Sequence, residues 1–426
     1  MPSLLTRIER YHLQVSALLF LTLFAPAAVA QAPRYPTEWP AAGRDAQPWT
    51  RWWWMGSAVT REHITSELQQ MARAGFGGVE VTAIYGVRGA DSASVPYLSP
   101  QWVKLLAHTA ATAHRLGMGV DLPQGSGWRM GGPFVPAADV NASLRVTRDS
   151  ARGGAYVAAI RPSGDRVKRP APGGEGPAID VFSRAATDRY LTTVADRLAP
   201  LPRGAIRSFF HDSFEYTGDG SSELFAAFTR RRGYDLTTEL PALAGEGDRD
   251  RVARVKSDYR QTLDEMLLEN FVQRLTVWSH ERGSMMREQA HGSPGNLLDL
   301  YAAADIPETE SFGPLGGPDA NPLIFRFASS AAHVAGRRLA SAEAFTWLGE
   351  HFSTSLDEIK RAADQLFLAG INHLVYHGTA YSPTDASWPG WEFYASSEFN
   401  PRNAWWRDLP AFNAYVTRVQ SVLQEG

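Results

Sequence analysis

The segment INHLVYH at residues 371–377 decides the fold, because it is the eighth in a series of short apolar segments with the character of strands. Ser355 and Glu358 have the spacing of a capping box that opens a helix before it. An apolar stripe from Trp405 to Leu423 predicts a helix after it. A closed parallel barrel needs eight strand-helix units, whereas an open doubly wound sheet usually has about five or six. We therefore predict an α/β protein with a (β/α)8 barrel fold.

The remaining units precede this segment in regular order. The other predicted strands are residues 50–56, 77–82, 118–123, 205–212, 284–289, 305–310 and 338–345, and helical spacing of apolar residues predicts helices between them. Residues 125–183 interrupt the alternation, because they are too rich in Gly and Pro for a long helix. We predict that they form an excursion with two or three short strands, within a barrel that spans residues 49–426.

The first thirty residues have the pattern of an export signal. Arg7 and Arg10 precede the apolar block VSALLFLTLF, and APAAVA before Gln31 has the small residues of a cleavage site. About ten apolar residues are fewer than the roughly twenty that span a bilayer, so a cleaved signal at 1–30 is favoured over a membrane anchor. Residues 31–48 form a Pro-rich lead-in. We expect a secreted or periplasmic protein without stable membrane insertion.

Composition narrows the possible partners. The 426 residues include 42 basic and 45 acidic side chains, a balance that does not favour nucleic acid and points to an uncharged small molecule or polymer. No cysteine is present, so an exported chain must be held by its core and not by disulfides. The 13 Trp and 14 Tyr include rings on which a sugar can stack, although core packing accounts for most of them.

Acidic and histidine residues recur at the carboxyl ends of the predicted strands, the end of the barrel that we call the mouth. They are Glu80, Asp121, Asp212, Glu215, Glu288, His291, Glu308, Glu310, Glu343 and His377. Paired carboxylates cleave glycosidic bonds, one as acid and one as base or nucleophile. Glu215 and Glu343 lie near the ends of the fourth and seventh predicted strands, which face each other across the mouth. The alternatives are a cap or loop salt bridge for Glu215, and a buried ion pair with an arginine such as Arg338 for Glu343.

So many carboxylates at one mouth require protons, an arginine or a metal to offset their repulsion. Asp212 and Glu310 carry the hard oxygen atoms that Ca²⁺ prefers. His291 and His377 lack the His-Glu-x-x-His spacing of zinc hydrolases, which favours hydrogen bonding over metal binding. No glycine-rich phosphate-binding motif follows the first strand.

Several segments together resemble glycoside hydrolase family 106, the calcium-dependent α-L-rhamnosidases. They are WWWMGSAVTREHI, AGFGGVEVTAIYG, GMGVDLPQGSGWRMGGP, HDSFE, REQAHG, DIPETE, AEAFTWLGEHF and GINHLVYHGTAYSP. They occur in order from about residue 49 to residue 424. Family members typically carry β-sandwich domains after the barrel, whereas this sequence stops just past its last predicted barrel helix.

The resemblance implies hydrolysis of terminal α-L-rhamnose with inversion, aided by Ca²⁺. It gives Glu215 the role of acid and Glu343 that of base, although the two can be exchanged. Asp212 and Glu310 would lie near the calcium. The residues expected to line the sugar pocket are Trp54, Asp121, Arg287, His291, Trp347 and His377. Alternatives are another exo-glycosidase, a sugar-binding barrel with impaired catalysis, and a metal-dependent hydrolase of a non-sugar substrate.

Overall fold

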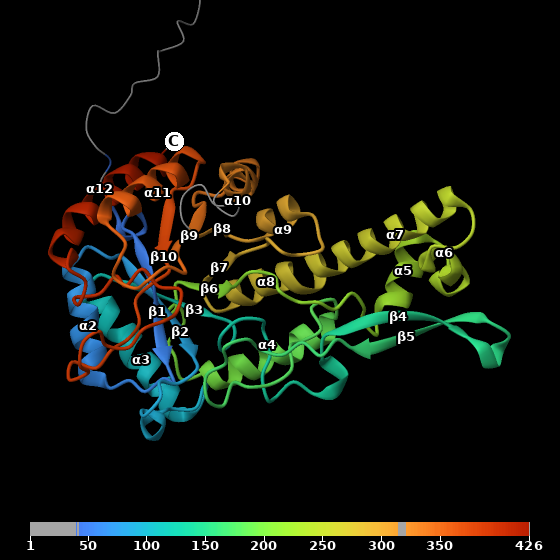
Figure 1. The fold of residues 1–426 in the computed structure, drawn as a ribbon, viewed down its shortest axis with the longest axis horizontal. Helices are drawn as coiled ribbons and strands as arrows, with labels where there is room; N and C mark the ends of the chain where they lie inside the picture. The colour runs from blue at the N-terminus through green and yellow to red at the C-terminus, as the bar shows by residue number, and fades with distance from the viewer. Residues whose placement is uncertain (1–39, 41, 314–320, 426) are drawn as a thin grey trace, which may run out of the picture. The chain divides into compact units, whose positions relative to one another are not determined.

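The predicted barrel is confirmed in a computed structural model that describes residues 40, 42–313 and 321–425. Eight parallel strands close in the order β1-β10-β9-β8-β7-β6-β3-β2 (Figure 1). The strands are β1 (Trp49–Met55), β2 (Gly78–Ile84), β3 (Gly119–Pro123), β6 (Ser208–His211), β7 (Met285–Glu288), β8 (Ile306–Phe312), β9 (Ser341–Thr346) and β10 (His373–Tyr376). Each predicted barrel strand is present. The predicted signal at 1–30 lies outside the described residues, as does most of the lead-in.

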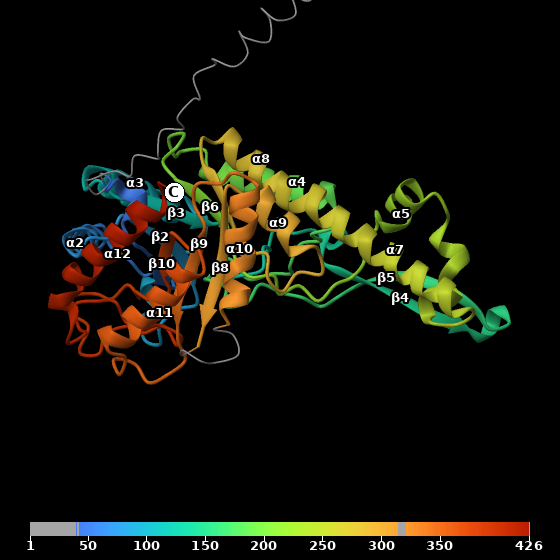
Figure 2. The ribbon, with the colours of Figure 1, turned by 90° about the horizontal axis from the view of Figure 1, so that it is seen from above.

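Helices alternate with the strands and surround them in both ribbon views (Figures 1 and 2). They are α2 (Arg61–Arg73), α3 (Pro100–Arg115), α4 (Arg184–Leu198), α5 (Leu224–Arg232), α6 (Leu240–Ala244), α7 (Arg249–Leu267), α8 (Gln273–Glu281), α9 (Leu297–Ala303), α10 (Pro322–Val334), α11 (Leu356–Leu368) and α12 (Leu409–Leu423). The capping box at Ser355 is confirmed, with both of its reciprocal hydrogen bonds present. A π-helical turn at Leu268–Val272 divides the long helix predicted over 251–282. Among the described residues, no helix has the length and apolar character to cross a bilayer.

The excursion contains two strands, in agreement with the two or three short strands predicted, and they form one antiparallel hairpin. Its strands β4 (Ala142–Asp149) and β5 (Ala155–Pro162) pair along their whole length and lie beside α6 (Figures 1 and 2). Isolated bridges hold the rest of the excursion together, and one of them joins Trp128 to Lys168. This bridge brings both residues to the mouth, where each contacts Glu215.

Alternation along β1 determines which of its side chains enter the barrel. Arg51 and Trp53 point inward, while Trp52 and Trp54 point outward into the core between strands and helices. At the amino-terminal end of the barrel, the Trp49 ring fills the space beside three glycines, Gly77, Gly78 and Gly119. A Cβ atom on Gly78 would lie 2.3 Å from Cζ3 of Trp49, so only glycine fits there without movement of the ring.

Candidate active site

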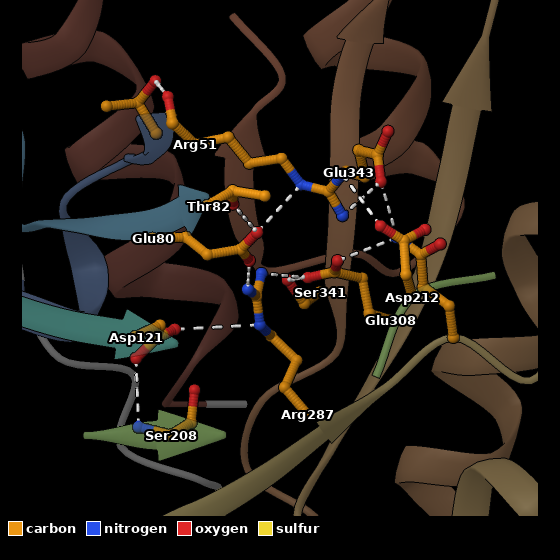
Figure 3. A network of polar contacts seen from close by, with 12 residues as sticks. Arg51, Glu80, Thr82, Asp121, Ser208, Asp212, Arg287, Glu308, Ser341 and Glu343 are labelled. Atoms are coloured by element: carbon orange, nitrogen blue, oxygen red, sulfur yellow. Dashed lines mark hydrogen bonds and ion pairs between the residues drawn. The ribbon is translucent and has the colours of Figure 1, made fainter. Parts of the chain in front are cut away.

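Arg51 is the centre of an ionic network inside the barrel (Figure 3). Each of its three guanidinium nitrogens contacts a different carboxylate. Nε lies 3.1 Å from Oε1 of Glu80, Nη1 lies 3.1 Å from Oδ2 of Asp212, and Nη2 lies 2.8 Å from Oε2 of Glu343. The guanidinium also stacks on the ring of Phe210, 4.8 Å from its centroid. Since Arg51 is only 2% exposed, it is the arginine that offsets carboxylate repulsion at this mouth.

A second arginine, Arg287, extends the network below the mouth. It contacts Glu80 and Glu308 and lies 3.7 Å from a carboxylate oxygen of Asp121. Arg207 holds Asp121 from the other side through two hydrogen bonds of 2.9 and 2.6 Å. Arg287, Asp121 and Glu308 are fully buried, so this layer fills the barrel interior with ion pairs in place of the branched apolar side chains usual there.

Glu343 lies at the top of the network and makes contacts through both of its oxygens. Oε1 accepts a hydrogen bond of 2.8 Å from Thr346 and lies 3.3 Å from Nε2 of His377, while Oε2 accepts one of 2.8 Å from Gln289. Burial alone would raise the pKa of Glu343, but the charges of Arg51 and His377 and these hydrogen bonds outweigh it and lower the pKa to about 2. Glu343 is therefore ionised at neutral pH.

Backbone strain occurs close to this carboxylate. Phe345 has a φ of +69°, in the left-handed region that bulky residues rarely adopt. It lies between Glu343 and Thr346, and the ladder from β8 to β9 shifts register just there, between Glu310 and Phe312. Such strain costs on the order of 1–3 kcal/mol and persists where surrounding packing enforces it. Here it accompanies the turn that returns the Thr346 hydroxyl to Glu343.

Glu215 lies beyond the end of β6 and is more open than Glu343, with its side chain 31% exposed. Oε2 is paired with the ammonium of Lys168 and accepts a hydrogen bond of 3.2 Å from the indole Nε1 of Trp128. Both partners come from the excursion after β3. Thus the loop salt bridge considered as an alternative for Glu215 is present, and so is the buried ion pair considered for Glu343, with Arg51 as partner in place of Arg338.

The two predicted calcium ligands each have a cationic or hydrogen-bonding partner in this arrangement. Asp212 is paired with Arg51, and Oε2 of Glu310 lies 2.9 Å from Nε2 of His291. Burial, then the charge of Glu343, raises the pKa of Glu310 to about 7. Within the described ranges, no three acidic, His or Cys side chains are grouped to hold a metal ion. Asp212 and Glu310 are thus each held by another side chain in this arrangement, and their role as calcium ligands stays a prediction.

Three residues predicted to line the sugar pocket lie elsewhere. Asp121 and Arg287 are completely buried in the ionic layer below the mouth. Trp54 points away from the mouth and packs edge-to-face against Trp102 of α3. Side chains alternate along a strand, so Trp54, three residues after Arg51, lies on the opposite face of β1. The structure therefore gives these three residues packing and charge-pairing contacts in place of the expected sugar contacts.

The other three predicted pocket residues lie near the mouth. His377 contacts Glu343, and His291 contacts Glu310. Trp347 lies just past the end of β9, and its indole Nε1 has no hydrogen-bond partner among the described residues. A buried indole N–H usually has a partner, so this donor is available to a ligand hydroxyl.

Several residues that make up this site were not predicted from the sequence: Arg51, Trp53, Trp128, Lys168, Gln289 and Thr346. Arg51 had a detectable signal, since a lone charge within a run of tryptophans in a buried strand must face the barrel interior. Because side chains alternate along a strand, Trp53 lies on the same inward face as Arg51, and Trp54 does not. Lys168 had no such signal, because it reaches Glu215 through an irregular excursion.

Comparison with known proteins identifies the family. The sequence matches the profile of glycoside hydrolase family 106, described as alpha-L-rhamnosidase, over residues 41–164 and 160–426. The chain belongs to this family. Among curated proteins, the family 106 barrel is similar to a putative beta-glucuronidase from Formosa agariphila, with 23% identity over 96% of this chain and 43% of that protein. The chain thus spans less than half of that relative's length.

Solved structures agree on the fold. A rhamnosidase from Novosphingobium sp. PP1Y superimposes with a TM-score of 0.74 and 17% identity, covering 90% of this chain and 60% of that one. A beta-galactosidase from Marinomonas ef1 superimposes with a TM-score of 0.52 and 12% identity, covering 89% of this chain and 59% of that one. At these identities the likeness shows the barrel fold alone.

Proposed function

We propose that this chain is a glycoside hydrolase that removes terminal α-L-rhamnose from glycosides or polysaccharides, with inversion at the anomeric carbon. Membership of family 106 supports the sugar and the bond cleaved. The relative named as a putative beta-glucuronidase also carries a glycosidase name, which supports the reaction class but favours a different sugar. We also propose that the chain is exported and that its first thirty residues are removed, which N-terminal sequencing of the exported protein tests.

The observation that carries the proposal is the contrast between the two glutamates. A glycosidase base must be ionised, and Arg51, His377 and two hydrogen bonds together lower the pKa of Glu343 to about 2 despite its burial. The acid must reach the leaving oxygen at the mouth, and Glu215 is the more exposed of the two. We therefore assign Glu343 as base and Glu215 as acid.

In this mechanism the sugar binds between Glu215 and Glu343. Glu215 gives its proton to the glycosidic oxygen as the bond to the anomeric carbon breaks. Glu343 takes a proton from the water that attacks the opposite face of the sugar. Thr346, Gln289 and Arg51 hold the Glu343 carboxylate in one orientation. NMR of the first-formed rhamnose anomer tests the inversion, since retention of the α configuration contradicts it.

The proposed sugar is tested with a panel of 4-nitrophenyl glycosides. We expect release from the α-L-rhamnoside at a rate at least about tenfold above that from the β-D-galactoside, α-L-fucoside and β-D-glucuronide. If another glycoside is hydrolysed faster, the chain is instead an exo-glycosidase for that sugar. Binding of rhamnose without hydrolysis by the folded chain favours the impaired sugar-binding barrel.

Calcium remains a prediction, and no step of the mechanism uses it. Its test is the same assay before and after removal of divalent ions with excess chelator, followed by return of Ca²⁺ alone. Loss of activity that Ca²⁺ restores supports the metal. Unchanged activity after chelation shows that the reaction does not need calcium.

One observation favours a different acid, because the raised pKa of Glu310 leaves this carboxyl partly protonated near neutral pH. Two substrates separate the candidates. Loss of the acid slows an alkyl rhamnoside far more than the 4-nitrophenyl rhamnoside, whose leaving group needs little protonation. Our assignment predicts this pattern for Glu215→Gln and not for Glu310→Gln. Glu281→Gln, at an exposed site at the end of α8, is the matched control.

A further inference from the structure

Two cations follow each other in the excursion, and the first of them contacts Glu215 at the mouth. Lys168 is paired with Glu215 and has a side chain that is 42% exposed. Its neighbour Arg169 is also exposed. Within the described ranges, no carboxylate lies within ion-pairing distance of Arg169. We call Lys168 and Arg169 the cationic rim.

The backbone fixes the position of the cationic rim. Lys168 and Trp128 exchange two backbone hydrogen bonds, of 2.9 and 3.2 Å. Arg169 has a φ of +53°, in the left-handed region. The segment also lies against Gly127, where an added Cβ atom would be 2.0 Å from the carbonyl oxygen of Lys168. The excursion therefore holds both side chains at a defined place.

Aromatic rings line the same part of the mouth. The Arg169 guanidinium lies 4.6 Å from the ring centroid of Tyr394 and 5.8 Å from that of Tyr85. The Lys168 ammonium lies 5.6 Å from the ring centroid of Trp128. Tyr85 follows β2 and Tyr394 follows β10, so loops from distant parts of the chain meet the excursion here. A cation stacked on rings keeps its outward N–H groups free for an anion.

We propose that the cationic rim binds an acidic sugar as the leaving group, one that carries a carboxylate or a sulfate ester. This inference rests on the proposed function, in which Glu215 protonates the leaving oxygen, so that groups around Glu215 border the leaving sugar. Rings offer stacking surfaces to its C–H faces, and the Arg169 fork offers paired N–H donors to its anionic group. The nearly balanced charge of the whole chain, which favoured an uncharged partner, conceals this local concentration of positive charge.

Three disaccharides that differ only at C6 of the second sugar test the proposal. They are α-L-rhamnosyl-1,4-D-glucose, the corresponding glucuronate and the corresponding glucose 6-sulfate. We expect kcat/KM to be at least about tenfold higher for one of the anionic pair than for the neutral disaccharide, the size of one charge-assisted hydrogen bond. Whichever anionic disaccharide is hydrolysed faster shows whether the cationic rim prefers a carboxylate or a sulfate ester. This preference falls as salt is added, because the rim is exposed.

The variant Arg169→Gln is expected to reduce the ratio of anionic to neutral kcat/KM to near one. Arg161→Gln, an exposed arginine at the end of β5, is the matched control and should keep the wild-type ratio. Equal rates on all three disaccharides in the wild type overturn the proposal, and so does an unchanged ratio in Arg169→Gln.

Failure of the proposed function has a different signature, because none of the disaccharides and no 4-nitrophenyl rhamnoside is then hydrolysed. In that case calorimetric titration of the folded chain with the glucuronate and glucose disaccharides still tests the rim. Tighter binding of the glucuronate, lost in Arg169→Gln, supports it. Equal affinity for the two disaccharides contradicts it.

Discussion

Replacement of Arg51 by Gln removes the side chain that joins Glu80, Asp212 and Glu343. Glu80 and Glu343 are almost fully buried, and Asp212 retains some contact with solvent. Removing one member of a buried ion pair typically costs about 3–5 kcal/mol, because the remaining charge stays buried. We expect a loss of about 4 kcal/mol in the free energy of unfolding at pH 7. Equilibrium urea unfolding followed by tryptophan fluorescence measures it.

The pH dependence separates lost charge pairing from lost packing. In Arg51→Gln the pKa of Glu343 rises because the arginine charge that lowered it is lost, so at pH 5 a proton partly replaces the missing guanidinium and the deficit against wild type shrinks. A deficit below about 1 kcal/mol at pH 7, or one that is equal at pH 5 and pH 7, refutes this reasoning. Arg361→Gln, which breaks an exposed ion pair with Asp357 on α11, is the control and should cost no more than about 0.5 kcal/mol.

Two further predictions concern stability. The folded pKa of Glu343, about 2, lies below its ordinary 4.5, so its contribution to stability is present above pH 4.5 and is lost as the pH falls through 2. Acid titration should therefore show a smaller loss of stability between pH 5 and pH 3 in Glu343→Gln than in wild type, and parallel losses contradict the shift. Gly78→Ala places a methyl group against Trp49 and should cost about 1–3 kcal/mol by thermal unfolding, whereas Gly43→Ala, with open space around it, should cost nearly nothing. Equal melting temperatures for the two glycine variants exclude the close contact.

The sequence predicted the barrel well because strand and helix signals are local. INHLVYH and GGVEVT are short apolar segments flanked by turn residues, and Ser99 and Ser355 carry capping signals, so each unit can be recognised by itself. The excursion was predicted less well. The pairing between β4 and β5 and the bridge from Trp128 to Lys168 depend on contacts across an irregular segment, which periodicity does not encode.

Strand-end position indicated which polar residues lie near the mouth better than it indicated where their side chains point. Strand-end position brought Glu343, His377 and Asp212 into consideration, and all three join the network at the mouth or contact it. Depth along a strand was not predicted, so Asp121 and Arg287 were expected at the surface of a pocket although the barrel buries them. Which cation pairs with which carboxylate is set by the closure of the barrel and becomes visible only in three dimensions.

The measurement that tests the central claim most directly is the turnover of 4-nitrophenyl α-L-rhamnopyranoside by wild type and Glu343→Gln, with circular dichroism to show that both are folded. The account predicts clear hydrolysis by wild type and a loss of roughly a thousandfold or more in the variant, because the base acts on both activated and unactivated substrates. A folded Glu343→Gln variant with wild-type turnover contradicts the assignment of Glu343 as the catalytic base.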